Sequence, residues 1–167
     1  MGSATPEAAA LLRGVALALQ IPESGIFTGY WEGRHGSLET MNAHLLIVED
    51  DAEMRDLLRK VLEKEGYRIS VAADGHEAVV SLSRDAFDLV VTDMLMPEDG
   101  GLQLLQAIRK THPALPVIII TAFGDWGSYS QALELGAAAF ISKPLKMGEL
   151  IGAIHTALVG RVAGQAA

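Results

Sequence analysis

Cysteine is absent from the 167-residue chain. Its absence excludes a disulfide framework and a thiolate metal site, and it fits the reducing cytoplasm, where we expect this protein to lie. Positive charge is also scarce, because 13 Lys and Arg stand against 21 Asp and Glu and give a formal net charge of −8. Direct binding to nucleic acid or to an anionic membrane is therefore not expected, since it needs a surplus of basic residues.

Long hydrophobic runs are missing as well. The longest apolar stretch near the start, residues 8–21, is interrupted by Arg13 and Gln20 and is shorter than a bilayer span requires. It is preceded by Glu7 and by no basic residue, which argues against a signal peptide. Half of the residues are nevertheless hydrophobic, so the chain can bury the core of one domain of ordinary size.

Residues 1–40 differ in pattern from the rest of the chain. One helix is expected over 6–20, with Thr5 as its N-cap and Pro6 at the first helical position. The glycine-rich stretch after it has no period of two or 3.6 and is interpreted as loop. The opening Met-Gly-Ser resembles a cloning scar, and Met41 directly precedes a strand pattern. We therefore interpret 1–40 as a tag or an upstream-derived extension, with a docking helix as the alternative.

From Met41 to about residue 160, short apolar runs alternate with segments of helical period. The predicted strands are 44–48, 67–72, 87–91, 116–121 and 138–142. The first predicted helix begins near Met54 and ends at Gly66. The other predicted helices cover 76–83, 102–111, 127–135 and 148–159. This alternation predicts an α/β fold with a parallel sheet covered on both faces, in a domain over 41–160. Residues 161–167 are interpreted as a tail or the start of a linker.

Carboxylates follow two of the predicted strands. Glu49, Asp50 and Asp51 come after the first strand, and Asp93 comes after the third. Ligands of open parallel sheets bind beyond the carboxyl ends of the strands, and neighbouring strands lie about 4.8 Å apart. If these two strands are neighbours, Asp50, Asp51 and Asp93 share one pocket, with Glu49 at its solvated rim. Carboxylates that close need a proton or a cation, and an oxygen-only cluster is what Mg²⁺ prefers.

Nucleotide-binding folds do not fit this pattern. Their first loop is rich in glycine or hydroxyl groups that cradle phosphate, whereas the corresponding residues here are acidic. Neither GxGxxG nor GxxxxGK[ST] occurs anywhere in the chain.

The joint order of these residues resembles the receiver domain of two-component response regulators. An Asp-Asp pair follows the first strand, Asp93 begins Asp-x-x-x-Pro after the third, Thr121 begins Thr-Ala after the fourth, and Lys143 begins Lys-Pro after the fifth. The resemblance covers residue 43 to about 160 and extends to chemotaxis-type single-domain and nitrogen-regulator-type receivers. It implies a flavodoxin-like doubly wound (βα)5 fold with a five-stranded parallel sheet in the order 2-1-3-4-5.

The resemblance also implies roles for single residues. Asp93 would accept a phosphoryl group from a sensor histidine kinase or a histidine phosphotransfer protein. Asp50, Asp51 and Asp93 would hold Mg²⁺ together with the backbone carbonyl of Leu95. Lys143 would pair with Asp93 and then with the phosphoryl oxygens. Such a domain is a phosphoacceptor with at most self-catalysed phosphotransfer and dephosphorylation, and not an enzyme in its own right.

A switch is implied beside this site. Thr121 would hydrogen-bond the phosphoryl group, and Phe140 would turn inward when Thr121 moves. The Lys143–Pro144 peptide bond is cis in this family. The surface formed by the fourth helix, the fifth strand and the fifth helix would then contact an effector or an output domain, and a homodimer on it stays open.

Several features qualify these expectations. The apolar side chains of Leu95 and Phe123 occupy positions that in relatives modulate the approach of hydrolytic water, which predicts slow self-dephosphorylation. The glycine and serine content of the helix near 127–135 predicts a short or mobile element. Trp126 and Tyr129 are read either as a partner contact or as cover for the end of the sheet.

Three alternatives remain open at this point. Asp50 or Asp51 could cap the first helix, because Asp50 and Glu53 have capping-box spacing. The domain could be a pseudo-receiver that binds proteins without phosphorylation. An aspartyl-nucleophile phosphatase shares the Asp, Mg²⁺ and Lys chemistry, but it normally needs a second Asp where Leu95 stands.

Overall fold

Five strands alternate with five helices in the computed structural model, which describes residues 40, 42–97, 100–122 and 126–165. The strands are β1 (His44–Val48), β2 (Arg68–Ala72), β3 (Leu89–Asp93), β4 (Val117–Thr121) and β5 (Ala139–Ser142). The helices are α3 (Ala52–Lys64), α4 (Gly75–Arg84), α5 (Gly101–Thr111), α6 (Trp126–Glu134) and α7 (Met147–Gln165). The helix expected over 6–20 and the residue Phe123 lie outside the described residues.

The strands form one parallel sheet in the order β2-β1-β3-β4-β5. The predicted flavodoxin-like α/β fold and its strand order are therefore confirmed. β1, β3 and β4 are paired on both sides, whereas β2 and β5 are the edges of the sheet. Within the described residues, no helix is both long enough and apolar enough to cross a membrane.

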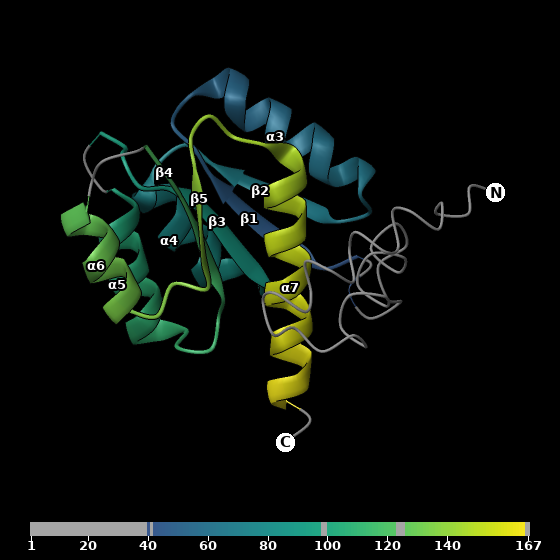
Figure 1. Ribbon diagram of the computed structural model, residues 1–167. Coiled ribbons are helices and arrows are strands. Elements are labelled where there is room, and N and C mark those ends of the chain that lie inside the picture. The colour runs from purple at the N-terminus through teal and green to yellow at the C-terminus, as the bar shows by residue number, and fades with distance from the viewer. Residues whose placement is uncertain (1–39, 41, 98–99, 123–125, 166–167) are drawn as a thin grey trace, which may run out of the picture. The chain divides into compact units, whose positions relative to one another are not determined.

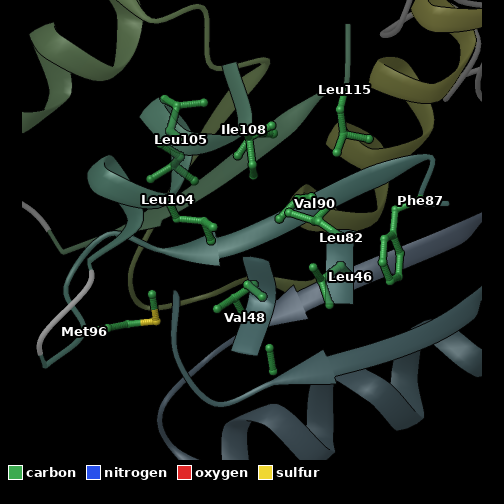
Figure 2. Packing of buried hydrophobic residues seen from close by; sticks show 14 of the residues in the cluster. Leu46, Val48, Leu82, Phe87, Val90, Met96, Leu104, Leu105, Ile108 and Leu115 are labelled. Carbon is green, nitrogen blue, oxygen red and sulfur yellow. The ribbon is translucent and has the colours of Figure 1, made fainter. Parts of the chain in front are cut away.

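Helices cover both faces of the sheet (Figure 1). Side chains alternate along each strand, so Leu45 and Val91 belong to one face and Leu46 and Val90 to the other. The first face packs against α3 and α7, and the second packs against α4, α5 and α6. Figure 2 shows residues of the second cluster, including Leu104 of α5, gathered between helix and sheet. Burying a side chain of this size stabilises the fold by about 1.5–3 kcal/mol.

Local signals in the sequence set the ends of α3. The Asp51 side chain caps its N-terminus by accepting a 2.7 Å hydrogen bond from the Met54 backbone N–H. Gly66 follows its C-terminal end with a φ of 93°, a conformation that glycine adopts without strain. The end of the helix at Gly66 was predicted, and the cap by Asp51 is one of the alternatives that the sequence left open.

The last helix is longer than expected. α7 continues to Gln165, whereas the sequence predicted an end near Val159 followed by a tail over 161–167. Glycine lowers helix propensity and made this segment resemble a linker. Within this extra segment, Arg161 Nη1 forms a 3.0 Å ion pair with Asp88 Oδ1 just before β3.

Candidate functional site

The register of β1 and β3 brings acidic side chains together at the carboxyl edge of the sheet. Leu45 pairs with Leu89 and Ile47 pairs with Val91, all on the face covered by α3 and α7. One further step of the same alternation leads to Glu49 and Asp93. The Glu49 backbone N–H donates to Ala72 O at 3.1 Å, so the chain keeps its strand-like pairing with β2 at this residue. Two carboxyl groups therefore leave adjacent strands on the same side.

Three carboxylates form one cluster there. Oxygen atoms of Glu49, Asp50 and Asp93 lie within 4.8 Å of one another. Glu49 and Asp93 are each 3% exposed, whereas Asp50 faces solvent. A cluster of carboxylate oxygens that is open on one side suits a hard divalent cation such as Mg²⁺, which usually keeps several of its waters. The donor set thus fits the metal that the sequence suggested.

The membership of this cluster differs by one residue from the metal site expected from the sequence. Glu49 was expected at a solvated rim but is buried inside the cluster. Asp51 was expected to hold the metal, yet its side chain caps α3 and lies outside the cluster of three. The physical reason is the end of β1: residue 49 still pairs with β2 and points into the edge, whereas residue 51 already belongs to the helix cap. Asp50 and Asp93 lie where they were predicted.

Asp93 is the last residue of β3 and is held at both of its oxygens. Its Oδ2 forms an ion pair with Lys143 Nζ, and its Oδ1 accepts a 3.0 Å hydrogen bond from the Leu95 backbone N–H. Lys143 reaches the site because its backbone N–H donates to Thr121 O at 2.9 Å, beyond the end of β5. The Lys143–Pro144 peptide bond is cis, as the resemblance implied.

Burial and charge act in opposite directions on the ionisation of Lys143. Burial lowers the pKa of Lys143, but the hydrogen bond to Asp93 and the charges of Asp93, Glu49 and Asp50 outweigh it and raise this pKa above its ordinary value. The ammonium group therefore stays charged over the physiological pH range. Its side chain is 40% exposed, so it can follow a group that enters from solvent.

The pKa of the Glu49 carboxyl group is raised, so the charged form is disfavoured in the folded protein. Burial raises the pKa of Glu49, and the negative charge of Asp93 adds to this effect. A 3.2 Å hydrogen bond from the Asp51 backbone N–H to Glu49 Oε1 opposes the shift but does not cancel it. Ionisation of Glu49 is therefore less favourable in the folded protein than in water, and a cation bound in the cluster would offset this effect.

A glycine lets the backbone turn tightly behind Asp93. A Cβ atom on Gly101 would lie 2.4 Å from the Asp93 carbonyl oxygen and 3.0 Å from Met94 Cα. The Gly101 N–H also donates to Met94 O at 3.1 Å, which joins the start of α5 to the end of β3. Asp93 is therefore fixed from its backbone as well as from its side chain.

Thr121 and Phe140 lie on the opposite face of the sheet from Lys143. Thr121 ends β4, pairs with Ser142, and donates its hydroxyl to Ala122 O at 3.1 Å. Phe140 packs against the cluster under α4, α5 and α6, and its ring centroid lies 4.4 Å from that of Tyr129 on α6. Of the two readings of Tyr129, the contact with Phe140 supports cover for the sheet. The side chain of Trp126 lies outside the described part of the chain.

This combination of a central acidic cluster, a strand-end Asp and a lysine after the last strand agrees with comparison to known proteins. Residues 45–155 match the response regulator receiver domain family. The chain belongs to this family. A receiver domain of a two-component system is a regulatory phosphoacceptor rather than a classical enzyme, and it implies a cognate histidine kinase.

The receiver is similar in sequence to parts of longer regulators. It is 40% identical over 114 residues to transcriptional regulatory protein CpxR of Escherichia coli K12, in an alignment that covers 68% of this chain and 48% of CpxR. It is 41% identical over 113 residues to response regulator protein PilR of Pseudomonas aeruginosa, covering 68% of this chain and 25% of PilR. The chain therefore spans less than half of the length of either relative.

Solved structures agree with the fold. NtrX from Brucella abortus superposes with a TM-score of 0.70 at 34% identity, over 75% of this chain and 29% of NtrX. A CheY-like response regulator receiver domain protein from Methanospirillum hungatei superposes with a TM-score of 0.71 at 28% identity, over 74% of this chain and 98% of the other.

Proposed function

We propose that Asp93 is the residue of this receiver that accepts a phosphoryl group from a phosphohistidine, carried by a sensor histidine kinase or a histidine phosphotransfer protein. The observation that carries this proposal is the environment of its carboxylate. One oxygen pairs with Lys143, the other accepts the Leu95 N–H, and two further carboxylates lie within 4.8 Å. No other described Asp combines such burial with a lysine partner and an acidic cluster.

The reaction is an in-line displacement at phosphorus. An oxygen of Asp93 forms a bond to phosphorus while the bond from phosphorus to the imidazole nitrogen of the donor breaks, and the imidazole leaves with its electron pair. The Lys143 ammonium moves from the carboxylate to the phosphoryl oxygens and neutralises their charge. The Thr121 hydroxyl supplies a hydrogen bond to the product. The rigid strand end of β3 keeps the Asp93 oxygen in place for the attack.

Mg²⁺ is the cofactor that these residues suit. We propose that Asp50, Asp93 and the backbone carbonyl of Leu95 hold it, with Glu49 taking the place first given to Asp51. When bound, the cation supplies positive charge that balances the carboxylates and the transferring phosphoryl group. Support comes from the oxygen atoms within 4.8 Å of one another and from the raised pKa of Glu49, which burial and the Asp93 charge cause.

The phosphorylated state is read at the surface of α6, β5 and α7. A phosphoryl group adds about −1.5 to −2 charges at Asp93, and this local change can act at a distance only by biasing an element with two arrangements. Phe140 and Tyr129, in ring contact between β5 and α6, are the residues through which we expect that bias to pass. The partner would be an effector protein, an output domain of the same regulator or a second receiver.

Intact-protein mass spectrometry after incubation with acetyl phosphate and Mg²⁺ tests the phosphoacceptor. We expect one added phosphoryl group on the wild type and none on Asp93→Asn or in the presence of chelator. Asp74→Asn is the matched control, because Asp74 caps α4 and asparagine caps equally well. A wild type that binds Mg²⁺ but gains no phosphoryl group would instead support a pseudo-receiver, and phosphorylation of Asp93→Asn would rule out the assignment.

A further inference from the structure

Arg55 connects α3 to the loop that carries the acidic cluster. It lies in the first turns of α3, and its guanidinium reaches back past the N-terminus of the helix. Its Nη1 donates to the carbonyl oxygen of Glu49 at 2.7 Å and to that of Asp50 at 3.2 Å. Both acceptors are residues whose carboxylates join Asp93 in the cluster.

The position of Arg55 matters because the cluster is repulsive. Like charges at this distance favour a loop that swings its carboxylates apart and into water. A side chain of a strand-end residue keeps its direction only if the peptide groups on either side cannot rotate. The loop is held before Glu49 by the bond to Ala72 O and after it by the Asp51 cap. Arg55 holds the two carbonyls between those points.

We propose that Arg55 is a positioning residue: it fixes the peptide groups of Glu49 and Asp50 so that both carboxylates face Asp93 and bind a divalent cation together. The proposal rests on the proposed function, because it assigns Arg55 to the same site. Arg55 acts through backbone oxygens, so its contribution is geometric and differs from that of a positive charge merely placed nearby.

Arg59 provides the matched control for charge. It lies four residues along the same helix, and its guanidinium forms a 2.5 Å ion pair with Asp56 of that helix. Arg59→Gln removes the same charge as Arg55→Gln from the same helix without removing a bond to the loop. Arg55→Lys keeps the charge but replaces the planar guanidinium by a single ammonium group.

The experiment is a titration of the full chain with Mg²⁺ alone, followed by amide chemical shifts in ¹H–¹⁵N NMR spectra. Wild type, Arg55→Gln, Arg55→Lys and Arg59→Gln are compared, each at a temperature well below its own unfolding transition. Removing a group that orients metal ligands typically weakens metal binding by about 10-fold or more. We expect that loss for Arg55→Gln, an intermediate loss for Arg55→Lys, and a change of less than about twofold for Arg59→Gln.

A measurement on the metal-free protein tests whether Arg55 holds the loop in place, independently of whether the site binds metal. Hydrogen exchange of the Asp51 and Met54 amides reports on the bonds to Glu49 Oε1 and Asp51 Oδ1. We expect faster exchange in Arg55→Gln than in Arg59→Gln. Equal metal affinity and equal exchange in these two variants would overturn the positioning role. A wild type whose spectrum does not respond to Mg²⁺ would overturn the proposed metal site instead, and the exchange rates would then decide the role of Arg55.

Discussion

Glu49 and Asp93 lie at the ends of the adjacent strands β1 and β3, and their carboxylates share one cluster although both residues are almost fully buried. The ionised form of Glu49, buried beside the charge of Asp93, destabilises the folded protein in the absence of a bound cation. Both residues stand at the ends of strands that are paired on both sides within the sheet. Stability and site chemistry are therefore linked at this edge.

The pH dependence of stability should reveal the cost of Glu49. Burial and the Asp93 charge raise its pKa in the folded state above the ordinary 4.5, so the folded protein binds this proton more tightly than the unfolded one. The penalty is therefore present above the raised pKa and disappears as pH falls towards 4.5. We expect metal-free Glu49→Gln to be more stable than wild type near neutral pH, by a margin that shrinks in acid. Urea denaturation at several pH values measures it, with the exposed Glu63→Gln as control.

The prediction fails if the difference in the free energy of unfolding between Glu49→Gln and wild type does not change with pH. It also fails if Glu49→Gln is the less stable protein at neutral pH, because the ionised Glu49 would then not destabilise the fold.

Adding one methyl group should have opposite effects at two glycines. A Cβ on Gly101 meets the Asp93 carbonyl oxygen at 2.4 Å, so Gly101→Ala must shift backbone and should destabilise the fold by about 1–3 kcal/mol. A Cβ on Gly152 of α7 meets nothing within 4 Å, so Gly152→Ala should stabilise by about 0.5–1 kcal/mol through helix propensity. Thermal unfolding should show a lower unfolding temperature than wild type for Gly101→Ala and a higher one for Gly152→Ala. Equal shifts for the two would contradict the close approach at Gly101.

Arg109 should be a major contributor to stability away from the site. Its guanidinium donates to Leu135 O and Gly136 O after α6, at 2.8 and 2.9 Å, and to Leu115 O before β4 at 2.8 Å. Arg109→Met removes these charge-assisted bonds but keeps the apolar stem, and we expect a loss of about 2–3 kcal/mol in the free energy of unfolding. Lys110→Met, one residue along and exposed, is the control. A loss no larger than that of the control would show that water replaces the guanidinium.

The lifetime of the phosphoryl group, on the proposed function, should depend on Leu95. Its backbone N–H binds Asp93 Oδ1, while its apolar side chain is 59% exposed and offers no hydrogen bond to an attacking water. We expect Leu95→Asn to speed the loss of the phosphoryl group by about tenfold. The decay is followed by mass spectrometry after removal of the donor. The exposed Leu133→Asn on α6 serves as control, and an unchanged decay in Leu95→Asn would refute the role of this side chain.

The sequence predicted the architecture well because its signals are periodic. Five apolar runs and five segments of helical period determined the elements to within a few residues, apart from the C-terminal end of α7. Residue types at strand ends located Asp93 and Lys143. The burial of Glu49 in the cluster was not predicted, because it depends on whether β1 pairs for one residue more, which an acidic run does not reveal.

Other contacts, within the site and away from it, could not be predicted for a different reason. Two hydrogen bonds of Arg109 join residues that are 26 and 27 positions apart in the sequence. At Gly101 there is no room for a Cβ atom, because the backbone at the end of β3 passes too close. Such contacts depend on the relative placement of elements, and periodicity carries no information about it. Arg55 is closer in sequence, but only the path of the loop shows that its acceptors are carbonyls of the acidic pair.

The position of β3 in the sheet has a mechanical consequence. Every residue of β3 is buried and the strand is paired on both sides, whereas β5 is an edge strand bound on one side only. The sheet is therefore stiff where Asp93 stands and compliant at its margin, two strands away. We therefore expect a displacement that starts at Asp93 to grow towards the edges of the sheet, with amide exchange slowest in β3 and faster in the edge strands β2 and β5.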